Sequence, residues 1–251
     1  MHIDLTGKTV LVTGASRGIG AEIARAMAGS GARVAVHYSA SEAEAAGVAE
    51  ACGDGAKTFG ADLGDADSCI ALWDAVTASF GRVDVLVNNA GVAQAVDDPS
   101  MDRWLAVWNR TLDVNLRAAA LLCRLATDHF AANGGGRIIN ISSRAAFRGD
   151  QPEYIAYAAS KGGMVALTRS IARGFGKQGI VAFNVAPGFT RTAMAQDFID
   201  QYGEDYAVSD IALTRLTEPK DVAPTVVFLA SGLADHATGA TIDINAASYV
   251  H

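Results

Sequence analysis

The feature that most constrains the fold of this chain is a regular alternation of short apolar segments with longer amphipathic segments. The apolar segments predict β-strands at residues 8–12, 33–38, 57–61, 83–87, 137–141, 180–185 and 241–244. Largely apolar strands of this kind are typical of a parallel sheet that is covered by helices on both faces.

Helical patterns separate these strands. The first runs from Ile19 to the glycines at 29 and 31, and others follow at 41–51, 66–80, 104–130, 155–175 and 219–230, with the fourth long enough for one or two helices. Right-handed crossovers between parallel strands then give an α/β fold: one doubly wound Rossmann domain over residues 1–251, with a seven-stranded sheet. Residues 189–216 interrupt this alternation of strands and helices, and we expect them to form the substrate loop.

Composition excludes several classes of protein. The net charge is −7, whereas nucleic-acid-binding surfaces are usually basic. No uninterrupted run of 18 apolar residues predicts a membrane span, and the first residues do not resemble a signal peptide. Three separated cysteines suit a reducing compartment, so we expect a cytoplasmic protein. The five histidines have no ligand spacing, and we expect no metal site.

A glycine-rich turn connects the first strand to the first helix. It reads Thr-Gly-Ala-Ser-Arg-Gly-Ile-Gly from position 13 to 20. Gly14 can form the tight turn, Gly18 lets the backbone approach a pyrophosphate, and Gly20 lets helix and strand pack closely. Because the amides of a helix N-terminus attract anions, this turn predicts a nucleotide site that also includes Ser16, Arg17 and Ile19.

The spacing of the glycines, TGxxxGxG, and a series of later motifs resemble the short-chain dehydrogenase/reductase family over nearly the whole chain. The later motifs are Asp62 after the third strand, NNAG at 88–91, Asn115, Ser143, Tyr157, Lys161 and NVAPG at 184–188. The resemblance implies NAD(P)-dependent hydride transfer between a ketone and a secondary alcohol. It also implies that Asn115 supports a proton-relay water, that Lys161 binds the nicotinamide ribose, and that further cofactor contacts come from Asp62, Leu63, Asn89, Ala90, Gly91, Tyr157, Pro187, Gly188, Thr190 and Thr192.

The spacing of Tyr157 and Lys161 suits the reduction of a carbonyl. Four residues apart, they share one face of a helix. The phenol can donate a proton, and a nearby ammonium is expected to lower its pKa. Ser143 would hydrogen-bond the substrate oxygen.

Tyr154 and Ser142 are the alternative choices. Tyr154 has Ala158 instead of lysine four residues later, so we expect it at the pocket mouth. Strand alternation sends Ser142 and Ser143 to opposite sides. Ser143 precedes Tyr157 by 14 residues, one more than is usual in the family, and we place the extra residue in a loop at 144–153 that borders the substrate.

The end of the second strand bears on the choice of cofactor. An acidic residue there binds the adenosine 2′-hydroxyl of NAD, but this strand ends in His37 and Tyr38, with no carboxylate before Glu42. Arg17 can reach a 2′-phosphate. The sequence therefore favours NADP with NAD as the alternative, and His37 is a candidate cofactor-binding residue.

Two alternatives to a small ketone or alcohol as substrate remain open. The chain resembles 3-oxoacyl-acyl-carrier-protein reductases, but Lys177 is the only candidate docking cation, and an acidic chain opposes an acidic carrier. A nucleotide-binding regulatory or structural subunit without turnover is the other alternative. The physiological substrate and the direction of reaction are not specified by these motifs.

We also expect a homodimer or homotetramer. Met164, Leu167 and Ile171 form an apolar stripe on the helix at 155–175. An exposed stripe of this size would favour association.

Overall fold

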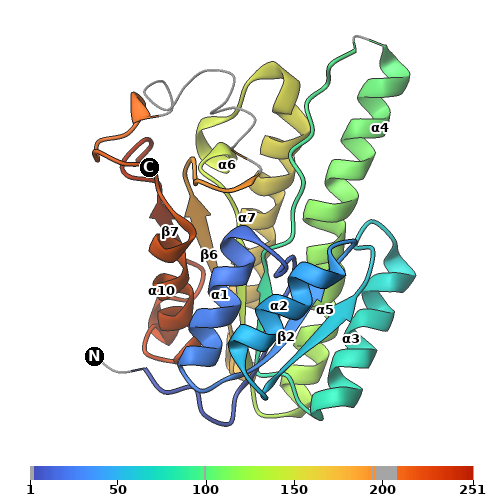
Figure 1. Cartoon of the computed structure of the whole chain (residues 1–251), viewed down its shortest axis with the longest axis vertical. Helices are drawn as coiled ribbons and strands as arrows, with labels where there is room; N and C mark the ends of the chain where they lie inside the picture. The colour runs from blue at the N-terminus through green and yellow to red at the C-terminus, as the bar shows by residue number, and fades with distance from the viewer. Residues whose placement is uncertain (1–2, 99, 194, 196–207, 251) are drawn as a thin grey trace.

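The computed structural model describes residues 3–98, 100–193, 195 and 208–250. Seven parallel strands form one sheet in the order β3-β2-β1-β4-β5-β6-β7 (Figure 1). The strands are β1 (Thr9–Val12), β2 (Arg33–Tyr38), β3 (Ala56–Gly60), β4 (Val85–Asn88), β5 (Gly136–Ile141), β6 (Ile180–Pro187) and β7 (Thr241–Ile244). The chain starts at the centre and winds outward in both directions, so the predicted doubly wound fold is confirmed.

Helices cover both faces of the sheet. Those among the described residues are α1 (Gly18–Gly29), α2 (Glu42–Cys52), α3 (Ala66–Phe80), α4 (Met101–Leu112), α5 (Ala118–Ala132), α6 (Ala145–Arg148), α7 (Ile155–Phe175) and α10 (Pro219–Ala230). One apolar core joins the sheet to α1, α2 and α10, and a second joins it to α3, α5 and α7. Successive side chains of a strand point to opposite faces of the sheet. In β1, Val10 and Val12 therefore lie in the first core, whereas Leu11 lies in the second.

Two segments have more structure than the sequence predicts. The expected helix at 104–130 consists of α4, a π-helical turn over Asp113–Arg117, and α5. The expected loop at 144–153 contains α6 and leads into a 3₁₀ turn over Pro152–Tyr154. Both lie at the carboxyl edge of the sheet, where open α/β sheets bind ligands.

The expected substrate loop is only partly described. Positions 194 and 196–207 lie outside the described residues. The base of the excursion is closed by a parallel bridge between Thr190 and Thr217. Ala195 and Leu216 are buried together against Phe189.

The apolar stripe that suggested oligomerisation is not exposed. Met164 and Ile171 are buried within their own chain, and Leu167 packs against the same core as Ile171. The sequence could not distinguish these two uses of an apolar stripe, because a core-facing helix has the same periodicity as an interface helix.

Candidate active site

Tyr157, which is half-buried, and Lys161, which is buried, project from the first turns of α7 beside the end of β5. The hydroxyl of Tyr157 is hydrogen-bonded to Ser143. The ammonium of Lys161 lies 5.7 Å from the centre of the Tyr157 ring and donates to the carbonyl of Ile141 at 2.9 Å. The structure thus brings Ser143, Tyr157 and Lys161 together, although they come from two elements.

The acid–base properties of this pair differ from the sequence-based expectation in one respect. Burial raises the pKa of Tyr157, an effect that the Ser143 hydrogen bond opposes and the charge of Asp150 reinforces. Burial lowers the pKa of Lys161 from 10.5 to about 8. The pKa of Tyr157 is therefore raised where the sequence predicts a lowering, and burial is the largest cause.

Asn115 lies in the π-helical turn between α4 and α5 and is fully buried. Its side-chain oxygen accepts from the amide of Val92 at 2.8 Å, and its nitrogen donates to the Val92 carbonyl at 2.9 Å and to Ser160 Oγ at 3.0 Å. Single π turns inside long helices are frequent at functional sites because they redirect a side chain. Asn115 therefore connects α7 to the segment that follows β4.

The two serines that follow β5 face different partners. Ser142 Oγ donates to the carbonyl of Val185 on β6 at 3.2 Å. Ser143 Oγ accepts from the amide of Ala145 at 3.1 Å and also bonds to Tyr157. Tyr154 is half-buried at the end of the 3₁₀ turn before α7. Of the two serines, Ser143 is therefore the one that reaches the tyrosine of the YxxxK motif.

The glycine-rich turn lies against the end of β4. Gly14 has a φ of +62°, and a Cβ there would lie 2.8 Å from Cα of Ala90. The side chain of Asn89 donates to the carbonyls of Thr13 and Gly14 at 2.9 and 3.1 Å. Gly20 is buried behind the turn, whereas Ser16, Gly18 and Ile19 are half-buried and Arg17 is exposed at the start of α1.

His37 lies beneath the glycine-rich turn. Its side chain is buried, with Nδ1 accepting from the amide of Gly14 at 3.0 Å and Nε2 lying 3.1 Å from the carbonyl of Ala61. This pattern requires a neutral ring protonated on Nε2, and burial lowers the pKa of His37 to about 4. The ring therefore holds the turn from below, and its nitrogens are not available to a cofactor.

Asp62 and Leu63 follow β3 at the adenosine end of the predicted site. The carboxylate of Asp62 forms two hydrogen bonds with Arg110 of α4, at 2.9 and 3.3 Å, and accepts from the amide of Gly64. The hydrogen bond from Arg110 is the main cause of the lowered pKa of Asp62. Leu63 is buried in the second core.

The segment after β6 reaches the other side of the turn. A Cβ on Gly188 would lie 2.7 Å from Cα of Asn245, so the backbones of these two segments are in contact beyond Pro187. Thr190 Oγ1 donates to the carbonyl of Gly188 at 3.0 Å. A Cβ on Gly18 would lie 3.4 Å from Thr192, which places Thr192 directly over the glycine-rich turn.

These features fit a nicotinamide cofactor. Gly14 and Gly18 both have positive φ, and α1 begins at Gly18 with its amide groups at the turn. At the other end, a Cβ on Gly91 would lie 3.3 Å from Lys161 Nζ and 3.4 Å from Asn115 Oδ1. The glycines therefore allow the turn, Thr192 and the buried lysine to be approached closely along the sheet edge, from the helix N-terminus to Lys161.

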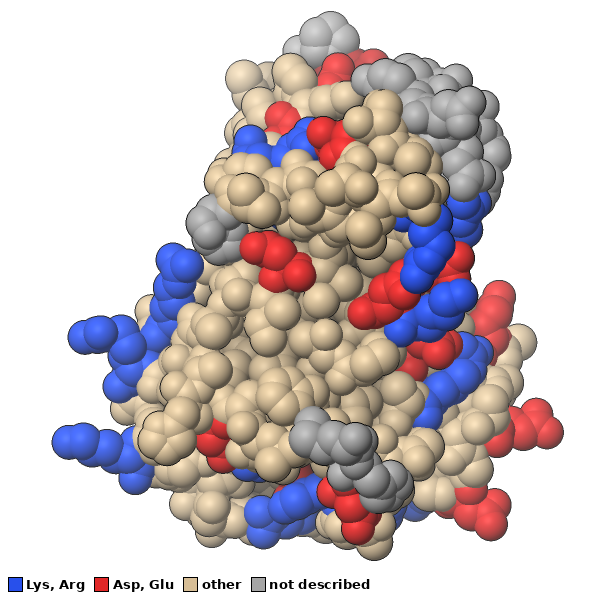
Figure 2. Space-filling model, turned by 90° about the vertical axis from the view of Figure 1, so that its left-hand side faces the viewer, with Lys and Arg blue, Asp and Glu red and all other residues tan. Residues whose placement is uncertain are grey.

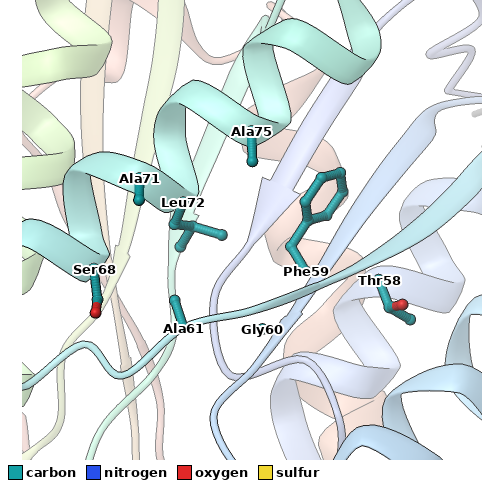
Figure 3. Close-up of a pocket in the computed structure, with 8 residues that line it drawn as sticks. All are labelled: Thr58, Phe59, Gly60, Ala61, Ser68, Ala71, Leu72 and Ala75. Atoms are coloured by element: carbon teal, nitrogen blue, oxygen red, sulfur yellow. The ribbon is translucent and has the colours of Figure 1, made fainter.

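A separate hollow of about 400 Å³ lies between β3 and α3 (Figure 3). Its polar side chains are the hydroxyls of Thr58 and Ser68, and the remaining lining is apolar or glycine. It contains no titratable group, so it lacks the means for acid–base chemistry. Among the described residues, no group of three His, Cys, Asp or Glu side chains could hold a metal ion.

Comparisons with known proteins agree with this geometry. A family model described as enoyl-(acyl carrier protein) reductase matches residues 14–246. The chain is 38% identical to 3-oxoacyl-acyl-carrier-protein reductase FabG of Staphylococcus aureus (strain N315) over 246 residues, covering 97% of this chain and 98% of the relative. It is 39% identical to D-threitol dehydrogenase of Mycolicibacterium smegmatis over 244 residues, covering 96% and 92%.

Solved structures give the same result. A protein of Sinorhizobium meliloti 1021 assigned as a short-chain alcohol dehydrogenase superposes with a TM-score of 0.91 at 32% identity, covering 99% of this chain and 98% of that one. Fold and site together define a nicotinamide-dependent oxidoreductase. The chain belongs to the short-chain dehydrogenase/reductase family.

Several residues that support the site were missed by sequence analysis. Arg110 pairs with Asp62, Ser160 accepts from Asn115, and Thr13 Oγ1 accepts from the amides of Asn89 and Ala90 at 3.0 Å. Ser160 lies inside the YxxxK motif and could have been suspected from its helical position. Arg110 has no signal in the sequence, because its contact with Asp62 spans 48 positions.

Proposed function

We propose that Ser143, Tyr157, Lys161 and Asn115 form the catalytic group of a reversible ketone reductase/alcohol dehydrogenase. When bound, the nicotinamide cofactor donates or accepts the hydride. Ser143 hydrogen-bonds the substrate oxygen, and Tyr157 donates a proton to that oxygen during reduction or removes it during oxidation. The observation that carries this proposal is the hydrogen bond between Ser143 and the half-buried Tyr157, with the buried Lys161 beside the ring.

The positions of Lys161 and Asn115 support their proposed roles. Lys161 is 3% exposed and has a pKa of about 8, so it can exchange a proton near neutral pH. Asn115 holds the Val92 segment and Ser160 in place, and we assign it the support of a water molecule that returns protons to the pair. Neither role needs a metal ion.

We infer a preference for NADP over NAD. β2 itself ends without a carboxylate, His37 is turned inward, and the nearby carboxylate of Glu42 is hydrogen-bonded to Tyr38. Arg17 is exposed at the start of α1 and makes no ion pair with the described residues. The remaining cofactor contacts are assigned to the glycine-rich turn, Asp62–Leu63, Asn89–Gly91 and residues 187–192.

The proposed substrate is a small ketone or secondary alcohol. A second candidate is a 3-oxoacyl group on a carrier protein, which the identity to FabG favours. Arg169, Arg173 and Lys177 recur every four residues on exposed positions of α7 and its continuation, and Arg169 and Arg173 border a hollow. This row adds two cations to the one that the sequence suggested for docking an acidic partner.

The test is binding followed by turnover. Fluorescence titration with NADPH and NADH measures cofactor preference, and a panel of ketones and secondary alcohols measures activity. Parallel assays with acetoacetyl-CoA and an acetoacetyl-carrier protein distinguish the two substrate candidates. Cofactor binding without turnover of any compound would instead indicate a nucleotide-binding subunit that lacks catalytic activity.

We further propose that the chain forms a homodimer or homotetramer. Figure 2 shows that the face on the side of β7 and α10 has a broad central area without charged side chains. Among the described strands β7 pairs with β6 alone, and Leu233, which follows α10, is 61% exposed. Sedimentation at micromolar concentration tests the proposal, which a monomeric mass would refute.

No helix within the described residues is long and apolar enough to span a membrane.

A further inference from the structure

Two arginines next to the catalytic serine share one carboxylate. Arg144 follows Ser143 directly, and Arg148 is the last residue of α6. Arg144 Nη1 donates to Asp210 Oδ2 at 2.8 Å, and Arg148 Nη1 donates to the same oxygen at 2.6 Å. Asp210 belongs to the segment between β6 and α10, so this cluster joins two elements that border the reaction centre.

The hydrogen bonds to Asp210 leave most donors of the cluster unused. A guanidinium has five N–H donors, and within the described part of the chain each arginine side chain makes one hydrogen bond. The side chain of Arg144 is only 17% exposed, but its unbonded nitrogens are not among the buried atoms sealed from solvent. These nitrogens therefore keep some contact with solvent, although most of the side chain is covered.

One carboxylate, that of Asp150, lies near both the arginine cluster and the reaction centre. The charge of Asp150 raises the pKa of Tyr157 and also that of Arg144, so this exposed carboxylate is near both groups. Burial and the charge of Arg148 have the opposite effect on the guanidinium and lower its pKa overall. The aromatic rings of Phe147 in α6 and Tyr249 in the C-terminal segment stack with their centres 6.4 Å apart. They add an apolar surface contributed by these two segments.

We propose that Arg144, assisted by Arg148, binds a carboxylate of the substrate, so that the enzyme acts on oxo acids and the corresponding hydroxy acids. This inference rests on the proposed function, because it needs the carbonyl to react at Ser143 and Tyr157. A carboxylate matches the forked donors of arginine with two parallel hydrogen bonds. Asp210 orients both guanidinium groups through a single oxygen, which leaves their other donors for the substrate.

The test compares each oxo acid with its methyl ester, which has the same ketone and no charge. Acetoacetate, 2-oxobutyrate and 4-oxopentanoate place the carboxylate at three distances from the ketone. For the best acid, wild-type kcat/KM should exceed that of its ester by at least about 10-fold, the worth of one charged hydrogen bond. R144M should lower kcat/KM for the acid by about 10- to 100-fold and change that for the ester less than about 3-fold.

Three further variants sharpen the test. R144K should fall between wild type and R144M, because lysine keeps the charge and loses the fork. R148M should have a smaller effect, since Arg148 is 38% exposed. R124M is the matched control: it removes the same charge from an exposed position on α5, where Arg124 pairs with Asp128, and should leave the acid preference unchanged.

The carboxylate site and the ketone reductase activity can be refuted separately. If wild type reduces acids and esters equally, or if R144M weakens both equally, the carboxylate site is refuted while ketone reduction stands. If wild type reduces none of these ketones with either cofactor, the proposed function fails together with the inference.

Discussion

The buried ring of His37 gives a quantitative prediction for the pH dependence of stability. Its pKa is lowered from 6.5 to about 4 in the folded chain, because burial disfavours the charged ring. The unfolded chain therefore binds a proton below about pH 6.5 that the folded chain does not accept until about pH 4. Stability that is fully present above pH 6.5 is lost as the pH falls through this window.

The magnitude follows from the two pKa values. A shift of about 2.5 units corresponds to roughly 3 kcal/mol once both states are protonated. Between pH 7 and pH 5 the loss from this one group is about 2 kcal/mol. For a chain of this length that is a decrease in Tm of about 4–8 °C.

The assay is urea unfolding of wild type and H37N at pH 7 and pH 5. Asparagine keeps an acceptor for the Gly14 amide but does not titrate. The other titrating groups are the same in both proteins, so their contributions to the pH dependence cancel in the comparison. Wild type should lose about 2 kcal/mol more than H37N. H236N is the control, since His236 is exposed, and should behave like wild type. Equal pH dependence of wild type and H37N would refute the argument.

Three other predictions concern the site. D62A should weaken NADPH binding about 10-fold in a fluorescence titration and change kcat much less, because Asp62 lies at the adenosine end and is held by Arg110. N115A should lower the free energy of unfolding by about 2–4 kcal/mol in urea, because both backbone groups of Val92 lose buried partners. Alcohol oxidation should accelerate as pH rises through about 8, where the Tyr157–Lys161 pair loses a proton, and K161A should shift that rise above pH 10 in a pH–rate profile. An unchanged Kd, an unchanged urea midpoint or an unchanged profile, respectively, would contradict them.

The sequence predicted the sheet well because each strand carries its own signal. β2, β7, α3, α7 and α10 have the predicted bounds, since apolar periodicity and the flanking glycines and prolines are local. The π-helical turn at Asn115 and the short helix α6 were not predicted. Both depend on contacts with distant segments, such as the hydrogen bonds from Asn115 to Val92, and these leave no periodic pattern.

The structure brings together Ser143, Tyr157 and Lys161, which the motifs had selected, but their detailed contacts were not predictable. The order of Ser143, Tyr157 and Lys161 along the chain indicated a reductase, but not that Lys161 would be buried against the Ile141 carbonyl. His37 was expected to touch the cofactor because it ends β2, yet its ring turns inward beneath Gly14. Side-chain direction at a strand end is set by tertiary packing, which local sequence does not encode.

The most direct test of the central claim compares Y157F with Y154F. Both variants remove one phenolic hydroxyl from tyrosines three residues apart, and only that of Tyr157 bonds to Ser143 in the proposed catalytic group. Y157F should reduce kcat for ketone reduction by at least about 10²-fold while keeping its affinity for NADPH, because the proton is used only in the transition state. Y154F should keep kcat within a few-fold of wild type. Near-normal kcat in Y157F together with an inactive Y154F would contradict the assignment.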